Sequence, residues 1–256
     1  MDHVLLTLLG FSIIFIATTL GAALVFFFVK GVSEKLNSVF SGLAAGIMIA
    51  ASVWSLIIPA IEQSSYLGTF AFFPSASGFL LGGAFMVLVD VFFTRSGNLF
   101  NNNYIRSAKT FIAITVHNIP EGLAVGFAFG AARLLGSDQA YLSALGLAVG
   151  IAVQNFPEGA AVSLPLKETC GSKIKSFLFG ALSGAVEPVA AVAGYFLAFA
   201  LTAVQPYLLS FSAGAMVFVV AEDLIPESVS KNRSHLGTWA IMIGFTLMMV
   251  LDVALG

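Results

Sequence analysis

Long apolar runs separated by short polar breaks follow one another along the whole chain. Eight of these runs predict helices, at roughly 4–30, 37–62, 70–94, 107–131, 140–166, 172–201, 206–229 and 235–255. Each is long enough to cross the hydrocarbon core of a bilayer, which takes about 20 apolar residues in an α-helix. The breaks leave no room for a soluble domain. The pattern therefore predicts an all-α integral membrane protein, with residues 1–256 as a single transmembrane domain of eight helices.

Composition supports this fold class, since 59% of the residues are hydrophobic and only 9% are charged. A soluble domain of this length could not hide that much apolar surface. A net charge of −2 without a basic patch gives no reason to expect a nucleic-acid partner. The first apolar run has no basic segment before it and exceeds the apolar part of a signal peptide, so we expect it to span the membrane. Cys170 is the sole cysteine, which excludes an internal disulfide and a cysteine-based metal cage.

The basic residues predict how the helices are oriented. Ten of the eleven Lys and Arg residues flank the first, third, fifth and seventh breaks, and only Arg133 lies in another break. Positive loops face the cytoplasm, so both termini are expected on the outer side. A wrong helix count would scramble this asymmetry. The short loops and the lack of a targeting segment favour a bacterial inner membrane.

One polar motif occurs twice in the apolar sequence. His-Asn-Ile-Pro-Glu-Gly at 117–122 returns 37 residues later as Gln-Asn-Phe-Pro-Glu-Gly at 154–159. The spacing of three and four residues places the polar side chains of each copy on one helix face. Ionisable residues at membrane depth indicate a functional site, and two copies on neighbouring helices indicate one site at a repeat interface. Pro120 and Pro157 are expected to open their helices one turn back and free backbone carbonyls.

Two further residues lie at the same predicted depth. Glu187, followed by Pro188, is in the middle of the sixth helix, and Met48 is in the second. Carboxylates alone at this depth would repel one another and take up protons, whereas a divalent cation between them removes that cost. Imidazole, carboxylate and amide groups suit Zn²⁺, Fe²⁺ or Mn²⁺, and a thioether adds some softness. The candidate ligands are Met48, His117, Asn118, Glu121, Gln154, Asn155, Glu158 and Glu187.

Acidic residues nearer the helix ends suggest a path. Glu62 and Asp252 lie toward the outer side and could collect cations, although a solvated surface role fits Glu62 equally well. On the cytoplasmic half, an exit path would use Asp90, Glu222 and Asp223, with Glu227 close enough to the interface to be merely solvated. His3 and His235, near helix ends, are expected to be incidental. Small residues repeat every four positions at Gly122, Gly126 and Gly130, at Gly146 and Gly150, and at Gly180 and Gly184, which predicts close helix packing.

The paired motif, the eight spans and the Glu187-Pro188 step resemble the Zrt-, Irt-like (ZIP) metal transporters, and especially their bacterial GufA-like branch. The resemblance covers essentially the whole chain. It implies a 3+2+3 arrangement of helices, with the proline-kinked fourth and fifth helices forming the metal site. It also implies uptake of zinc, or of iron, manganese or cadmium, with the metal as transported substrate and no prosthetic group. A homodimer and alternating access by two moving bundles are further implications.

The resemblance also implies two ion positions. The first would use His117, Glu121, Gln154 and Glu158, with Met48, and the second would use Asn118, Asn155 and Glu187 and share the two motif glutamates. Gln154 replaces a histidine common in many members, and Asn155 is neutral where some members carry Asp. The loop at 95–106 has no histidines, so a histidine-rich sensing role does not apply to it.

Two other classes of function are weighed against metal transport. A proton or monovalent-cation channel or relay would need only carboxylates and water, and would leave His117 and Met48 unexplained. An intramembrane hydrolase would activate water on a bound metal. The His-x-x-x-Glu spacing lacks the paired histidines of His-Glu-x-x-His, and Pro120 interrupts the helix which that motif needs. The sequence therefore predicts a transporter and not an enzyme.

Overall fold

The computed structural model describes residues 2–27, 33–97, 103–229 and 235–255, and within its helices the side chains of 93–97, 103–110, 112–114, 117, 165, 168–170, 199 and 202 lie outside the description. The described chain is helical throughout, without strands. Its α-helices are α1 (His3–Ala23), α2 (Glu34–Ala51), α3 (Ile58–Gln63), α4 (Phe72–Gly97), α5 (Asn103–Leu135), α6 (Asp138–Cys170), α7 (Lys173–Gly184), α8 (Val186–Ala200), α9 (Gln205–Val219), α10 (Ile225–Val229) and α11 (Leu236–Leu255). Short 3₁₀ segments follow at Leu24–Phe26, Ser65–Phe70 and Thr202–Val204.

Seven helical segments of the described residues are long and apolar enough to cross a membrane: His3–Phe26, Glu34–Gln63, Phe72–Phe92, Asp138–Leu164, Lys173–Ala198, Gln205–Val229 and Leu236–Leu255. They correspond to seven of the eight predicted helices. The predicted fourth helix, 107–131, corresponds to α5, a 33-residue helix that carries the first polar motif and is not one of the seven. The chain is thus a multi-pass membrane protein built from helices.

Several helix ends follow directly from local sequence. The side chains of Asp2, Ser33, Ser137 and Ser172 accept hydrogen bonds from backbone N–H groups in the first turns of α1, α2, α6 and α7. Such caps satisfy donors that have no partner inside the helix. Gly171 ends α6 with a φ of 63°, a left-handed conformation that glycine adopts without strain.

Helix irregularities occur beside three prolines outside the polar motif. The π-helical segments Ser52–Ile57 and Val220–Leu224 each lead into an Ile-Pro pair, which begins α3 and α10 respectively. A turn at Ala185 separates α7 from α8, just before Glu187 and Pro188. In contrast, α5 and α6 run without interruption through Pro120 and Pro157, so the opening predicted there is not seen as a break in either helix.

Four helix pairs pack most extensively: α1 with α6, α5 with α8, α2 with α11, and α4 with α9. In each pair a glycine of one helix lies against the backbone of the other, and a Cβ there would meet a carbonyl oxygen of the partner helix. The close-packing role predicted for the repeated small residues is therefore seen at Gly122, whose partner is the carbonyl of Glu187.

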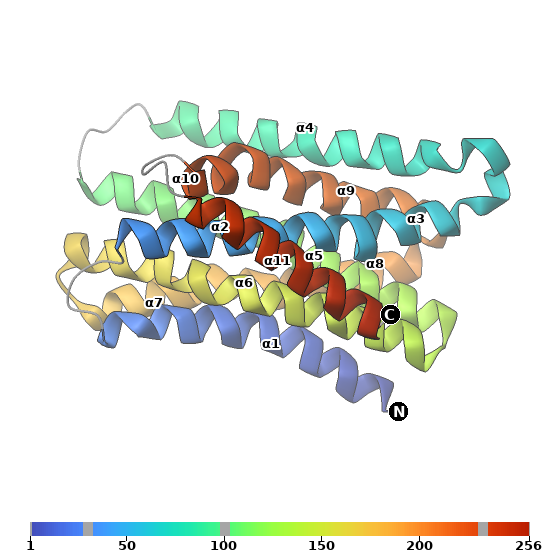
Figure 1. The fold of residues 1–256 in the computed structure, drawn as a ribbon, viewed down its shortest axis with the longest axis horizontal. Coiled ribbons are helices and arrows are strands. Elements are labelled where there is room, and N and C mark those ends of the chain that lie inside the picture. Colours follow the sequence, from blue (N-terminus) through green and yellow to red (C-terminus); the bar gives the residue numbers. More distant parts are fainter. Residues whose placement is uncertain (1, 28–32, 98–102, 230–234, 256) are drawn as a thin grey trace.

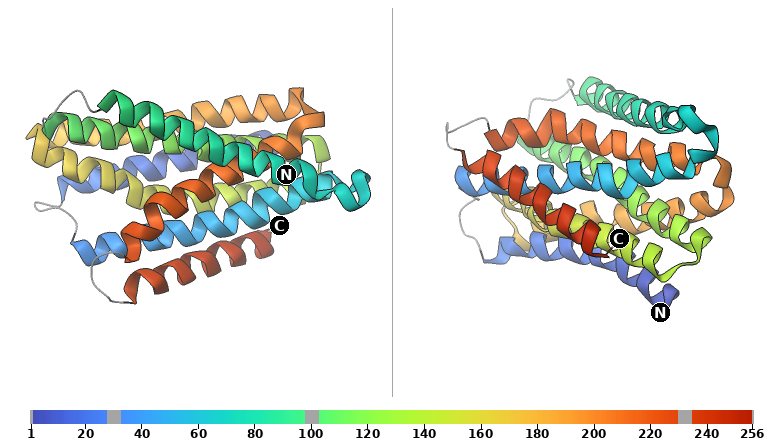
Figure 2. Two further views of the ribbon diagram at one scale, coloured as in Figure 1. Left: turned by 90° about the horizontal axis from the view of Figure 1, so that it is seen from above. Right: turned by 45° about the vertical axis from the view of Figure 1, so that its right-hand side comes forward.

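The helices form two groups (Figure 1). We call α1 and α5–α8 the first group, and α2–α4 with α9–α11 the second group. They meet where α5 packs on α9 and where α6 packs on α2 and α11. The two chain ends lie at the same end of the bundle (Figures 1 and 2), which we call the terminal end, and which includes His3 and Leu255. The other end, which we call the far end, includes the start of α2 and the helix α10, which are joined by a hydrogen bond from Asn37 to Glu227 (Figure 1).

His3 has a defined structural role at the terminal end. Its Nε2 lies 2.6 Å from Oδ1 of Asp138, and its ring stacks on Tyr141 with centroids 4.0 Å apart. These contacts tie the start of α1 to the start of α6. The expectation that His3 is incidental is therefore incomplete, although the pair is well exposed and contributes little to stability.

Candidate metal site

The polar residues of the two motif copies are buried in the middle of the bundle. Asn118 and Glu121 on α5, Gln154 and Asn155 on α6, and Glu187 on α8 are each no more than 1% exposed. Burying polar and charged groups is costly unless they are hydrogen-bonded or hold a cation. The contacts of each side chain therefore indicate what it does.

Glu187 accepts hydrogen bonds from three helices. Its Oε1 lies 3.0 Å from Thr18 Oγ1 and 3.0 Å from Asn118 Nδ2, and its Oε2 accepts from Asn155 Nδ2. Thr18 is on α1, Asn118 on α5 and Asn155 on α6. We call these four residues the Glu187 hub.

Both asparagines of the hub also donate to the backbone. Asn118 Nδ2 donates to the carbonyl of Ser183 over 3.0 Å, and Asn155 Nδ2 donates to the carbonyl of Ile14 over 3.3 Å. Both N–H bonds of each amide group are thereby used. Oδ1 of Asn118 and Oδ1 of Asn155 are buried and have no hydrogen-bond partner among the described residues.

Two more side chains of the motif copies have buried atoms without partners in the described part of the chain. They are Glu121, through Oε2, and Gln154, through both Oε1 and Nε2, and the Gln154 amide lies beside the Glu121 carboxylate without a well-formed hydrogen bond to it. An unpaired buried polar group costs about 1–3 kcal/mol, so such a concentration in one place calls for an explanation. Carboxylate and amide oxygens are ligands that divalent cations accept, and the residues present therefore fit a cation as the missing partner.

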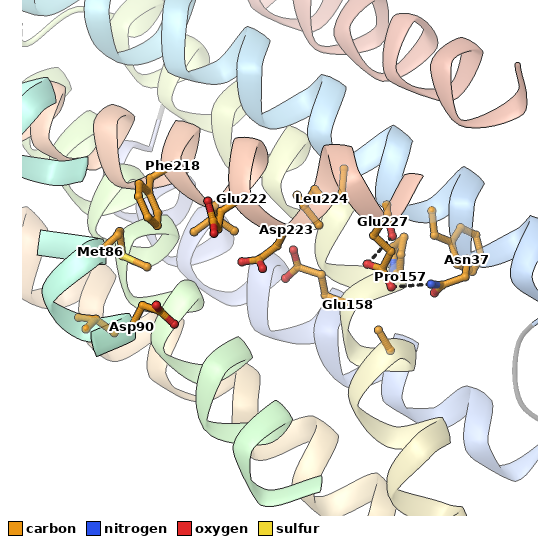
Figure 3. A pocket seen from close by; sticks show the side chains of 16 residues that line it. Asn37, Met86, Asp90, Pro157, Glu158, Phe218, Glu222, Asp223, Leu224 and Glu227 are labelled. Atoms are coloured by element: carbon orange, nitrogen blue, oxygen red, sulfur yellow. Dashed lines mark hydrogen bonds between the residues drawn. The ribbon is translucent and has the colours of Figure 1, made fainter. Parts of the chain in front are cut away.

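Glu158 is half-buried and lines a cavity of about 320 Å³. Three residues of α6, including Glu158, form one wall, and the second group of helices forms the rest. Four other carboxylates line it, from Asp90, Glu222, Asp223 and Glu227. Figure 3 shows the carboxylates of Glu158 and Asp223 pointing toward one another across this acidic cavity. The predicted exit residues are thus brought together with a motif glutamate.

The acidic cavity reaches toward the far end of the bundle. Its lining includes Asn37 in the first turns of α2 and Glu227 of α10. The Glu227 carboxylate accepts hydrogen bonds from Asn37 Nδ2 at 2.6 Å and from Ser41 Oγ at 2.9 Å. Glu227 is therefore more than a solvated residue, since it joins α10 to α2 at the rim of the cavity (Figure 3).

The other predicted site residues are placed as follows. Met48 is 1% exposed and belongs to the main apolar core. His117 is on α5, with its side chain outside the described residues. Glu62 is exposed at the end of α3, whereas Asp252 of α11 is buried and accepts a 2.6 Å hydrogen bond from Ser55. Both lie toward the terminal end.

The described side chains do not include a ready-made cage of three His, Cys, Asp or Glu residues. Glu187 faces the hub and Glu158 lines the acidic cavity, and amide groups supply many of the remaining oxygens. The sequence reasoning missed Thr18 and Ser55. A threonine or serine in an apolar helix carries no signal of its own, because its hydroxyl also bonds to the carbonyl one turn back, as Thr18 does with Ile14.

Comparison with known proteins decides the family. The family model described as ZIP zinc transporter matches residues 94–252. A human protein named zinc transporter ZIP11 is 37% identical, with 93% of this chain and 94% of the relative covered. Zinc transporter GufA of Myxococcus xanthus is 35% identical, with coverages of 94% and 95%. Zinc transporter ZupT of Streptococcus mutans is 30% identical, with 92% of each covered.

The chain belongs to the ZIP family. This confirms the resemblance drawn from the paired motif, and with it the expectation of a membrane transporter and not an enzyme. The matched region contains both motif copies and Glu187.

Proposed function

We propose that the chain carries divalent metal cations into the cytoplasm through the buried polar cluster, with zinc as the first candidate and iron, manganese and cadmium as further ones. The family membership supports this, as do three relatives that are named zinc transporters. The metal is the transported substrate, and we expect no prosthetic group.

The observation that carries the proposal is the set of buried oxygens without partners. Glu121 and Gln154 come from the two motif copies on neighbouring helices, and neither has a described partner for the atoms concerned. A proton relay would use the carboxylates but would leave the amide of Gln154 without a role. A divalent cation accepts carboxylate and amide oxygens together and thereby removes the cost of their burial.

The proposed topology has eight spans, with α5 as the fourth, in one domain over residues 1–256. Both termini would lie on the outer side of a bacterial inner membrane, and the helices would follow the 3+2+3 arrangement of the family. Lys35, Lys173 and Lys175 lie near the far end and Arg133 near the terminal end, which supports a cytoplasmic far end. Lipid would cover the exposed apolar faces, and a homodimer is part of the proposal.

The proposed route passes from the terminal end to the far end. Glu62 and Asp252 would attract cations at the entrance. Glu158 would bind the cations at the border between the polar cluster and the acidic cavity. Inside the cavity, the carboxylates of Asp90, Glu222 and Asp223 would lower the energy of a cation that moves toward the cytoplasm. The acidic cavity on the far side supports an inward-facing conformation in the proposed alternating-access cycle.

The resemblance implies two ion positions in the cluster. The first would be formed by Met48, His117, Glu121, Gln154 and Glu158, and the unpartnered atoms of Glu121 and Gln154 support it. The second would be formed by Asn118, Asn155 and Glu187 and would share Glu121 and Glu158.

Uptake of radioactive zinc into proteoliposomes tests the proposed function. We expect saturable uptake by the wild type and its loss in the double variant Glu121→Ala/Glu158→Ala. Iron, manganese and cadmium as competitors would give the order of selectivity. If zinc entered no faster than into empty liposomes while a proton or monovalent-cation current persisted, the proposal of metal transport would be refuted. The chain would then be a proton or monovalent-cation relay.

A further inference from the structure

The backbone fixes the orientation of both asparagines in the Glu187 hub. The carbonyls of Ser183 and Ile14 can only accept hydrogen bonds, so the side of each amide that faces them must be the NH₂ group. The two ends of an amide have almost the same shape. Turning either one around, however, would place two oxygens against each other. The hydrogen bonds to the two carbonyls therefore fix each amide in the orientation in which its Nδ2 also faces Glu187.

This orientation decides what surrounds the Glu187 carboxylate. Asn118 and Asn155 each direct one N–H bond to it, and Thr18 directs a hydroxyl to it. A divalent cation bound there would meet hydrogen-bond donors instead of lone pairs. To offer their oxygens to an ion at Glu187, both amides would have to turn around and give up their backbone acceptors as well. Asn118, Asn155 and Glu187 therefore do not fit an ion held between the three of them, and the implied second position would keep only the shared Glu121 and Glu158.

The identity of residue 155 is central to this arrangement. An aspartate would have no N–H bond to offer to Glu187 or to the Ile14 carbonyl, and it would set two carboxylates against each other. That pair would have to share a proton or hold a cation. The asparagine of this chain instead satisfies the carboxylate directly, within a cluster that is fully buried.

We propose that Glu187 is a positioning residue and not an ion ligand, and that the chain carries one divalent ion at a time, held by the half of the cluster that contains Glu121, Gln154 and Glu158. The hub joins α1, α5, α6 and α8, and it turns the Asn118 and Asn155 oxygens away from Glu187. This inference rests on the proposed function and narrows it, since it excludes the binuclear arrangement.

Counting bound zinc tests the inference. The full chain would be purified in detergent and saturated with Zn²⁺, and the ions per chain would be measured by elemental analysis and by calorimetric titration. We expect one ion in the wild type and one in Glu187→Gln, with the affinity of the variant weakened roughly tenfold to a hundredfold, as is usual when a supporting residue is lost. Two ions in the wild type, one of which is lost in Glu187→Gln, would overturn the inference.

Asn155→Asp provides the opposite test, because it removes the donor and adds a carboxylate. We expect this variant to bind a second ion. A stoichiometry that stays at one would show that the Asn155 amide is not what keeps an ion away from Glu187, and the inference would fall. Since the stoichiometries of the wild type and of Glu187→Gln are measured independently, the inference stays testable even if Asn155→Asp does not fold.

Thr18→Val and Thr18→Ser separate positioning from general packing. Valine keeps the size of the side chain and removes its hydroxyl, whereas serine keeps the hydroxyl. We expect weaker zinc affinity in Thr18→Val at an unchanged stoichiometry, and near-normal affinity in Thr18→Ser. Equal affinities in the two variants would contradict the role of the hydroxyl. Absence of any zinc binding in the wild type would instead overturn the proposed function itself, which distinguishes the two failures.

Discussion

The Ser55 hydroxyl donates a 2.6 Å hydrogen bond to the carboxylate of Asp252, and both residues are buried. Ser55 lies in the π-helical segment that precedes Ile58, and Asp252 lies in the last helix, so the bond joins α11 to the irregular part of the second spanning segment. A carboxylate at this depth depends on such a donor, since an unpaired buried charge is costly.

Ser55→Ala is therefore expected to destabilise the protein. Removing the donor leaves Asp252 buried with less compensation, at a cost of about 1–3 kcal/mol. The measurement is the melting temperature of the purified protein in detergent. Ser64→Ala is the matched control, because Ser64 is also buried but its hydroxyl donates to the backbone carbonyl of Ala60 in the preceding helix. An equal fall of the melting temperature in the two variants would show that the hydrogen bond to Asp252 adds no stability beyond that of a local hydroxyl–carbonyl bond.

Gln154→Leu is expected to raise stability and lower zinc affinity together. Leucine has a similar size and removes two buried atoms without a well-formed hydrogen bond among the described residues. The metal-free protein should gain less than the full value of about 1–3 kcal/mol, because the amide also lies beside the Glu121 carboxylate. Loss of an ion ligand should weaken zinc binding, which titration measures. Gln205→Leu serves as the control, since Gln205 is also buried with an unpartnered Nε2 but lies at the start of α9. A Gln154→Leu variant that melts earlier and binds zinc normally would refute the ligand role.

Gly122→Ala is expected to disturb the contact between α5 and α8. A Cβ at this position would meet the carbonyl oxygen and Cα of Glu187, so the two helices would have to move apart next to the hub. Overpacking of this kind costs about 1–3 kcal/mol. Thermal unfolding and zinc uptake would both report it. Gly83→Ala is the control, because a Cβ there meets open space, and an equally large loss in the control would contradict the packing argument.

Cysteine labelling can locate the acidic cavity relative to the membrane. In a Cys170→Ser background, which removes the only native thiol, Ala161→Cys places a thiol in the cavity wall. We expect a membrane-impermeant maleimide to label it in inside-out vesicles and not in right-side-out vesicles, since reaction requires an accessible thiol. Ala148→Cys, on the same helix but fully buried, should stay unlabelled. The reverse vesicle preference would invert the proposed topology.

The sequence predicted the helices well, because a helix that crosses a bilayer needs about 20 apolar residues and such runs are easily recognised. It also predicted that Asn118, Glu121, Gln154, Asn155 and Glu187 are buried, since the polar motif lies in the middle of two apolar runs. The irregularities were not predicted. The prolines of the two motif copies predicted irregular helices at Pro120 and Pro157, but the helices are interrupted elsewhere. The effect of a proline on a helix depends on which neighbouring groups replace the hydrogen bond that it removes.

Contacts between helices that are distant along the chain could not be predicted from the sequence. Thr18 and Glu187 are 169 positions apart, and nothing in the apolar stretch around Thr18 marks its hydroxyl as a partner for that carboxylate. The direction of the amides was also hidden, because it depends on two backbone carbonyls that only the fold brings near. The spacing of the motif thus predicted where the polar cluster lies. Which of its residues bond to Glu187 could be seen only from the packing of four helices.

Several glycines inside the two helix groups have different neighbours from two glycines that lie between the groups. Within a group, Gly122, Gly159, Gly46 and Gly214 lie against the rigid backbone of a partner helix. Between the groups, Gly150 and Gly146 of α6 face the side chains of Met248 and Leu255 on α11. A Met or Leu side chain can change rotamer, whereas a carbonyl in a helix cannot yield. Where α6 meets α11, the glycine contacts are therefore made by side chains that can change rotamer, and a sliding motion of the two groups would meet less resistance there than at the backbone contacts of Gly122, Gly159, Gly46 and Gly214.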